Sequence, residues 1–268
     1  MNVCRCIQQI GLIVMCSFIF SPLIAQNPAP WNGKKCAVVL TYDDGLNVHL
    51  NNVIPALDSV GLKGTFYISN YFNGINTQIT GWRKAAAEGH ELGNHTVYHP
   101  CEGGRPGREF VKGDYDLRKY TVRRMTDEIR MMNSFLMAVD GKTKRTFAFP
   151  CGDRKIGDTF YFDGLQNEFV AARGVAPSMP TIEKVDLNNV SCYGVNGQTG
   201  DQLIALVKQA MEKNALLVFL FHGVGGEHAL NVSLDAHSQL LHFLANNKKD
   251  IWIAPMIDVA EYVKTGRN

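Results

Sequence analysis

Short apolar runs alternate with longer amphipathic stretches along most of this chain, and this alternation constrains the fold more than any other feature. The apolar runs have the length and composition of buried strands: 36–41, 64–68, 92–95, 146–149, 169–172, 216–221 and 251–254. Helices are predicted between them, where apolar residues recur every three or four positions: 51–60, 80–88, 120–139, 201–213, 234–245 and 257–264. Residues 101–114 and 174–198 are rich in turn formers, so we expect loops there. The pattern predicts an α/β fold with a parallel sheet and helices outside it.

The composition is that of one globular domain. The chain has 268 residues, of which 46% are hydrophobic and 19% are charged, which excludes a disordered or collagen-like chain. Lysine and arginine number 27 against 25 acidic residues, so no basic surplus indicates binding to nucleic acid or to an acidic membrane. We find no internal repeat and expect a single domain over residues 26–268.

The first 25 residues have the layout of a secretory signal peptide. Arg5 is their only charged residue, and an apolar run over 10–24, interrupted by two serines and a proline, precedes a small residue for cleavage at Ala25. An uncleaved anchor is the alternative, but the run is short and broken for a stable membrane span. A lipid-anchored Cys16 is a weaker alternative. We therefore expect a secreted or periplasmic protein without stable membrane insertion.

Export changes how the cysteines are interpreted, because a disulfide is permitted outside the cytoplasm. Cys36, Cys101, Cys151 and Cys192 follow the predicted cleavage site. Cys101 and Cys151 each come directly after a proline, and both a bridge between them and two unpaired thiols remain open. Cys36 opens a strand and is interpreted as a small buried hydrophobe.

Polar residues gather at the carboxyl ends of three predicted strands. Asp43 and Asp44 follow the first, His95 and His99 follow the third, and His222 follows the most apolar one. In a closed barrel these strand ends meet at one mouth, whereas in an open sheet only the ends at the switch point meet. The distribution favours a closed barrel.

These residue types suit metal-dependent hydrolysis. Adjacent side chains on an extended chain point in opposite directions, so one aspartate of the pair can bind a metal while the other serves as base. His95 and His99 have i, i+4 spacing, which puts both rings on one face of a helical turn, and an aspartate with two histidines is a three-ligand set for catalytic zinc. His222 suits a general acid. A solvated Asp-Asp-Gly turn and an ordinary core histidine are the structural alternatives.

Four motifs in this order resemble the polysaccharide deacetylases of carbohydrate esterase family 4, which share the chitooligosaccharide deacetylase homology domain. They are TYDDG at 41–45, HTVYHP at 95–100, FAFPCG at 147–152 and LFH at 220–222. The match extends over about residues 35–262. The resemblance implies a distorted (β/α) barrel of about seven strands.

The resemblance also implies a role for each of the five polar residues. Asp44, His95 and His99 would hold a divalent metal ion, most often Zn²⁺. Asp43 would be the base that takes a proton from the attacking water, and His222 would protonate the departing amine or alkoxide.

Substrate contacts follow from the same resemblance. The Cys151 backbone N–H would help to hold the oxyanion, Pro150 would lie beside it in the third motif, and Leu220 would face the acetyl methyl. Typical members carry an arginine at the position of Ala148, and Arg173 from a later strand is the candidate replacement, with a purely structural arginine as the alternative. The aspartate and tryptophan of the fourth motif are not recognisable, and Asp153 is a candidate partner for His222.

The function implied is removal of N- or O-linked acetyl groups from an oligo- or polysaccharide by an exported enzyme. The same fold hydrolysing a non-peptide C–N bond of a small molecule is the first alternative. A non-catalytic carbohydrate-binding protein is the second, although binding alone needs neither Asp43 nor His222. The motifs do not distinguish chitin-like, peptidoglycan and xylan substrates, nor do they identify the native metal or the oligomeric state.

Overall fold

The computed structural model describes residues 1, 30–72 and 74–266 of the chain. The predicted signal peptide, apart from its first residue, lies outside these described residues. Among them, no helix is both long and apolar enough to cross a membrane.

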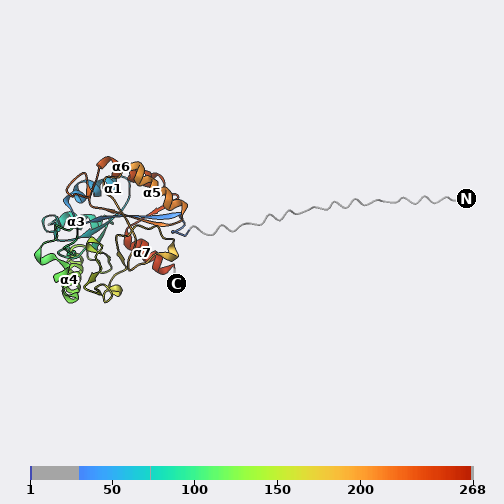
Figure 1. The fold of residues 1–268 in the computed structure, drawn as a ribbon. Helices are drawn as coiled ribbons and strands as arrows, with labels where there is room; N and C mark the ends of the chain where they lie inside the picture. Colours follow the sequence, from blue (N-terminus) through green and yellow to red (C-terminus); the bar gives the residue numbers. More distant parts are fainter. Residues whose placement is uncertain (2–29, 73, 267–268) are drawn as a thin grey trace.

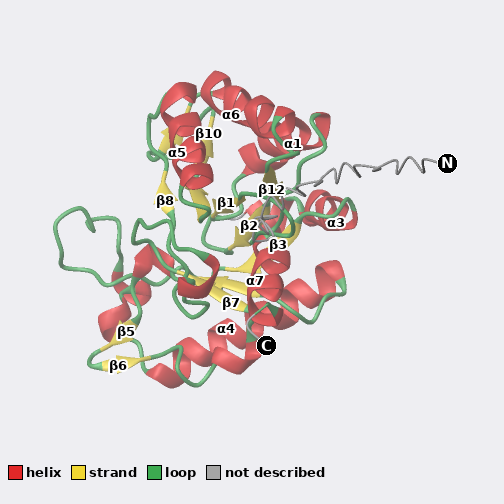
Figure 2. Ribbon diagram, turned by 90° about the vertical axis from the view of Figure 1, so that its right-hand side faces the viewer, coloured by secondary structure: helices red, strands yellow, loops and turns green. Residues whose placement is uncertain are grey.

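A parallel sheet of eight strands forms the centre of the molecule (Figures 1 and 2). Seven strands follow one another in the order β7-β4-β3-β2-β1-β9-β8, and β12 pairs with the start of β1. Their bounds are β1 (Cys36–Asp43), β2 (Thr65–Ile68), β3 (Glu91–Asn94), β4 (Thr146–Ala148), β7 (Ala171–Arg173), β8 (Tyr193–Gly194), β9 (Leu216–Phe221) and β12 (Ile251–Ile253). This is the distorted (β/α) barrel that the sequence analysis predicted.

One irregular segment connects the two edges of this sheet. On one side the Ala172 N–H donates to Leu187 O at 2.7 Å and the Val190 N–H donates to Ala172 O at 2.8 Å, which ties the segment to β7. A few residues later, β8 pairs with β9. The prediction of a loop throughout 174–198 is therefore wrong over the two residues of β8. This strand has only two residues and its pairing is made by main-chain atoms, so it has no apolar pattern to detect.

Helices surround the sheet (Figures 1 and 2). A π-helical turn over His49–Val53 precedes α1 (Ile54–Ser59), and α2 (Gly74–Thr77) precedes α3 (Ile79–Ala87). The longer helices are α4 (Val122–Asp140), α5 (Gly200–Glu212), α6 (Leu234–Asn246) and α7 (Met256–Thr265). Each predicted helix is present, with ends shifted by a few residues, because caps decide where a helix stops. Thr121 caps the start of α4, and Gly141 ends that helix with a φ of 73°.

The central strands are buried on both faces, which explains their uninterrupted apolar runs. Val38 and Leu40 of β1 pack in the largest core cluster, which also contains residues of α5 and α6. Val39 and Leu220 belong to a second cluster, which includes residues of α7. Two small strand pairs lie outside the main sheet: β5 (Lys155–Ile156) with β6 (Thr159–Phe160), and β10 (Gly223–Val224) with β11 (Asn231–Val232). The second pair shapes a loop beside the candidate site.

Candidate active site

The carboxyl ends of the central strands meet around a cavity of about 750 Å³. The predicted site residues that line it are Asp43, Asp44, His95, His99, Cys151, Leu220 and His222. Aromatic and aliphatic side chains make up much of the remaining wall: Tyr71, Phe72, Phe110, Phe149, Val175 and Leu230. A concave site with apolar walls and a few convergent polar groups is the usual form of a small-molecule or active site.

Asp44, His95 and His99 are arranged as a three-ligand metal site. Asp44 Oδ1 lies 3.7 Å from His95 Nε2 and 3.5 Å from His99 Nε2. Ligands about 2.1 Å from a tetrahedral ion are about 3.4 Å apart, so these spacings fit a zinc-sized cation. Asp44 Oδ1 is buried and has no hydrogen-bond partner among the described residues, which is the state expected of an oxygen that faces a cation.

Hydrogen bonds at Nδ1 also leave the Nε2 lone pair of each histidine free to bind a metal. His95 Nδ1 is 2.8 Å from the Ala148 carbonyl oxygen. A carbonyl only accepts, so Nδ1 carries the proton and the Nε2 lone pair faces the site, an arrangement common at metal centres. Burial, followed by the charge of Asp43, raises the pKa of Asp44 well above its usual value. A divalent cation between these three residues would supply the opposing charge that keeps Asp44 ionised.

The turn between the two histidines is not the helical turn on which the argument from their i, i+4 spacing rested. Thr96 and His99 both have positive φ angles, 64° and 50°. Side chains build the turn: Asn94 Oδ1 accepts from the Thr96 N–H at 2.8 Å, and Thr96 Oγ1 accepts from the His99 N–H at 2.9 Å. The ring centroids of His95 and His99 still lie 4.7 Å apart. These local hydrogen bonds compete with helix formation, yet they bring both rings to the same side.

Asp43 lies beside the predicted metal ligands and forms a buried ion pair with Arg173. Arg173 Nη2 donates to Asp43 Oδ2, while Asp43 Oδ1 is buried without a partner among the described residues. Burial alone would raise the pKa of Asp43, but Arg173, His95 and His222 outweigh it and lower the pKa below its usual value. Asp43 is therefore ionised, as a base must be. Arg173 approaches from the end of β7 and does not line the cavity itself.

His222 faces the same cavity from the end of β9. Burial is the largest cause that lowers its pKa, to about 3, and its Nδ1 has no hydrogen-bond partner among the described residues. Asp153, the candidate partner, accepts hydrogen bonds from the Glu102 N–H at 2.8 Å and from Arg108 Nη1 at 2.9 Å. Its proposed pairing with His222 is wrong, because these partners occupy its carboxylate.

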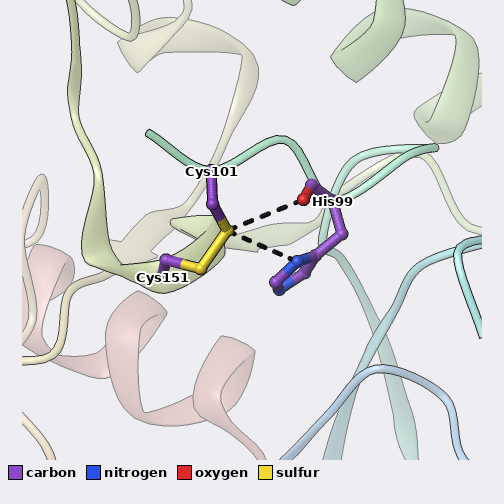
Figure 3. A group of neighbouring side chains, drawn as sticks. All are labelled: His99, Cys101 and Cys151. Atoms are coloured by element: carbon purple, nitrogen blue, oxygen red, sulfur yellow. Dashed lines mark hydrogen bonds between the residues drawn. A yellow bond between two sulfur atoms is a disulfide. The ribbon is translucent and has the colours of Figure 1, made fainter. Parts of the chain in front are cut away.

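A disulfide joins the residue that follows the second motif to the third motif (Figure 3). Cys101 and Cys151 are bonded, and His99 Nδ1 lies 3.6 Å from Cys101 Sγ. A disulfide sulfur has no hydrogen to donate, so Nδ1 must be the donor in this contact. This again leaves the His99 Nε2 lone pair for a metal. The sequence left open a bridge or two unpaired thiols, and in the structure the two cysteines are bridged.

The predicted substrate contacts are divided between the cavity wall and the layer behind it. Cys151 lines the cavity with a φ of 55°, and Leu220 lines it from β9. Pro150 is buried and does not line it. The positive φ of Cys151 turns its backbone sharply at the end of β4, next to the predicted metal ligands.

His228 lies at the site, although its position in a loop favoured a solvated histidine over a substrate contact when the sequence alone is considered. Its side chain is only 20% exposed, and its ring stacks on that of His222 with centroids 4.6 Å apart. The signal that was available is the glycine-rich stretch at 223–226, which allows the chain to fold back over the strand end.

Comparison with known proteins identifies the family. Residues 32–160 match the family model described as polysaccharide deacetylase. The chain is also 26% identical over 120 residues to the peptidoglycan-N-acetylmuramic acid deacetylase PdaA of Bacillus subtilis. Residues 32–160 thus belong to the polysaccharide deacetylase family. The alignment with PdaA covers 44% of this chain and 39% of that protein.

Solved structures show how widely this barrel is shared. A putative polysaccharide deacetylase from Mycobacterium smegmatis superposes with a TM-score of 0.61 at 14% identity, over 87% of this chain and 92% of that one. The allantoinase PuuE superposes with the same TM-score at 9% identity, over 94% and 98% of the two chains. At such identities the likeness is one of fold alone.

Proposed function

We propose that this polysaccharide deacetylase family member is an exported, metal-dependent hydrolase that removes acetyl groups from a carbohydrate. The observation that carries the proposal is the Asp44, His95 and His99 set, with a buried unpartnered Asp44 oxygen, directly beside the ionised Asp43. A pure binding site has no need for a base next to a cation. The signal peptide predicted over residues 1–25 supports export to the compartment where such glycans occur.

In the proposed mechanism each residue acts on a defined atom. A divalent cation, most often Zn²⁺ in such a ligand set, supplies Lewis acidity and lowers the pKa of water when it is bound. Asp43 accepts the proton of the attacking water, and Arg173 keeps its carboxylate ionised and oriented. The Cys151 N–H donates to the developing oxyanion. His222 would transfer a proton to the departing amine or alkoxide, and because its resting pKa of about 3 leaves the ring neutral, that proton has to come from the attacking water by way of Asp43.

The cavity supports a substrate larger than a single acetyl group. Its volume of about 750 Å³ and its aromatic wall suit a glycan segment with its acetyl group directed toward Leu220. The N- and O-acetyl linkages share the same carbonyl chemistry, so the assay must include both.

The experiment that tests the proposal is acetate release by chelated protein with and without added zinc. The substrates are N-acetylglucosamine oligomers, peptidoglycan fragments and acetylated xylan, with allantoin included to test a non-peptide C–N bond. We expect zinc-dependent acetate release from at least one glycan. Stoichiometric zinc binding without any acetate release would overturn the proposal and favour another substrate or a binding role.

Replacing the base separates catalysis from binding. We expect Asp43→Asn to lower kcat by about 10²- to 10⁴-fold, the usual contribution of a general base, while zinc content stays at one per chain. Asp163→Asn, at an exposed carboxylate, is the matched control and should retain full activity. An Asp43→Asn enzyme as active as this control would remove Asp43 from the mechanism.

A further inference from the structure

The loop after β9 brings a polar side chain to the site that the proposed chemistry does not use. This loop, residues 223–232, leaves the sheet just after His222 and returns so that Gly223 pairs with Asn231. His228 lies on it and lines the cavity together with His222. A Cβ on Gly223 would lie 2.3 Å from the carbonyl oxygen of Gly226, so glycine is required for the loop to close this tightly.

The neighbouring residue fixes the loop to the other side of the site. The Glu227 carboxylate accepts hydrogen bonds from Asn47 Nδ2 at 2.7 Å and from the Val48 N–H at 2.6 Å. Asn47 and Val48 follow shortly after Asp44 in the chain, so His228 is held in a set position relative to the predicted metal ligand. A donor held in place before the substrate arrives costs little ordering entropy on binding.

Hydrogen bonding determines which nitrogen of His228 carries the proton. Its Nδ1 accepts from the Leu230 N–H at 3.0 Å. A neutral imidazole has one N–H and one lone pair, so the proton lies on Nε2. Nε2 is 3.8 Å from Asp44 Oδ2, which is too far for a hydrogen bond. No hydrogen bond from this N–H is found among the described residues, and His228 lines the cavity, so the N–H is available to a ligand there.

We infer that His228 positions the substrate, its Nε2–H donating a hydrogen bond to a hydroxyl or ring oxygen of the glycan next to the acetylated position. This inference rests on the proposed function and names a contact on the leaving-group side of that site. The stacked ring of His222 is 4.6 Å away at an angle of 14°. A sugar oxygen held by His228 therefore brings the departing atom within reach of His222.

A second cation is the competing occupant of this space. The ligand atoms of Asp44, His222 and His228 lie within 4.8 Å of one another. A cation on His228 Nε2 would need the lone pair there and would force the proton onto Nδ1, where the Leu230 N–H already points. The two hydrogens would then face each other, so the geometry favours a donor over a metal ligand.

Two substitutions distinguish the contribution of the His228 N–H donor from that of its stacked ring. His228→Phe keeps the stacking on His222 and removes the N–H, whereas His228→Gln loses the ring and keeps an N–H donor. We expect His228→Phe to raise KM about three- to tenfold, the range for one neutral hydrogen bond, with little change in kcat. His228→Gln should recover most of this loss. His242→Ala, at an exposed histidine of α6, is the control and should match the wild type.

Binding without turnover tests the inference apart from the proposed function. In the Asp43→Asn background, calorimetry with the same glycans should show a three- to tenfold weaker Kd when His228→Phe is added, with one zinc per chain in both proteins. An unchanged Kd and KM, the absence of glycan binding, or two zinc ions per chain would each overturn the inference. Wild-type protein that binds glycan through His228 but releases no acetate would instead reject the proposed function alone.

Discussion

At the scale of single residues, the chemistry of this site depends on a cation and an anion that are 130 positions apart in the chain. Arg173 at the end of β7 and Asp43 at the end of β1 form an ion pair in which both side chains are buried. Both side chains are almost fully removed from solvent, so each charge depends on the other. Ala148 occupies the position where the family resemblance implied an arginine, and Arg173 delivers a guanidinium to Asp43 from a different strand.

Breaking this pair should destabilise the protein. We expect Arg173→Gln to lower the free energy of unfolding by about 3–5 kcal/mol, because Asp43 would remain as an uncompensated buried charge. Urea denaturation measures this directly. The Asp43→Asn/Arg173→Gln double variant should recover part of the loss, since no lone charge is left. Arg123→Gln, at a side chain 91% exposed, is the control, and equal stability of this variant and Arg173→Gln would contradict the pairing.

At the scale of elements, the site is built at the ends of several strands, and the turns that follow these strands are linked to one another. The Cys101–Cys151 bridge ties the turn after β3, which holds both histidines, to the turn after β4, which presents the Cys151 backbone (Figure 3). The same sulfur accepts from His99 Nδ1. The bridge thus orients a predicted ligand as well as linking two elements.

Removal of the bridge should affect both stability and metal affinity. The Cys101→Ser/Cys151→Ser variant should lose about 4 kcal/mol of unfolding free energy, from chain entropy over the 50-residue separation. Its zinc affinity should fall about tenfold or more, as is usual when a contact that orients a metal ligand is lost. Cys36→Ala, which removes an unpaired buried thiol, should leave zinc affinity unchanged. Peptide mass spectrometry that finds Cys101 and Cys151 unlinked before reduction would refute the bridge.

At the scale of the whole molecule, burying several neutral histidines makes the folded state sensitive to acid. Burial is the largest cause in each case, and it lowers the pKa of His49 to about 4 and of His237 to about 3. His237 Nε2 lies 2.8 Å from the hydroxyl of Tyr42, which stacks between Phe66 and Phe221 in the core. Both rings are neutral in the folded protein at pH values where they are protonated in the unfolded chain.

Stability should therefore fall as the pH decreases below about 6.5, the usual pKa of histidine. The unfolded chain binds protons there and the folded protein does not, so each such histidine costs up to about 1.4 kcal/mol per pH unit. We expect His237→Gln, which keeps a polar partner for Tyr42, to reduce the slope of unfolding free energy between pH 6 and pH 5 by up to this amount. The exposed His242→Gln is the control. An unchanged slope in His237→Gln would contradict the burial of a neutral ring.

The sequence by itself determined those features that depend on local pattern. Buried strands need continuous apolar runs and amphipathic helices need a period of 3.6, so the alternation along the chain predicted the order of the main elements and the barrel. The carboxyl ends of β1, β3 and β9 are where Asp43, His95 and His222 are found, and parallel strands bring those ends to one side. The signal peptide and the catalytic roles of these residues stay predictions.

The tertiary structure alone decided the features that depend on contacts between distant positions. No local pattern relates Arg173 to Asp43 or Cys101 to Cys151, because each pair is brought together only when separate strand ends converge. His228 meets the ring of His222 only because the loop after β9 folds back on itself. The turn from His95 to His99 does not have the helical form that its spacing suggested, since side-chain hydrogen bonds to the backbone override the spacing rule. Periodicity shows which face of an element is buried, whereas the partners of a buried charge or thiol depend on how the elements pack.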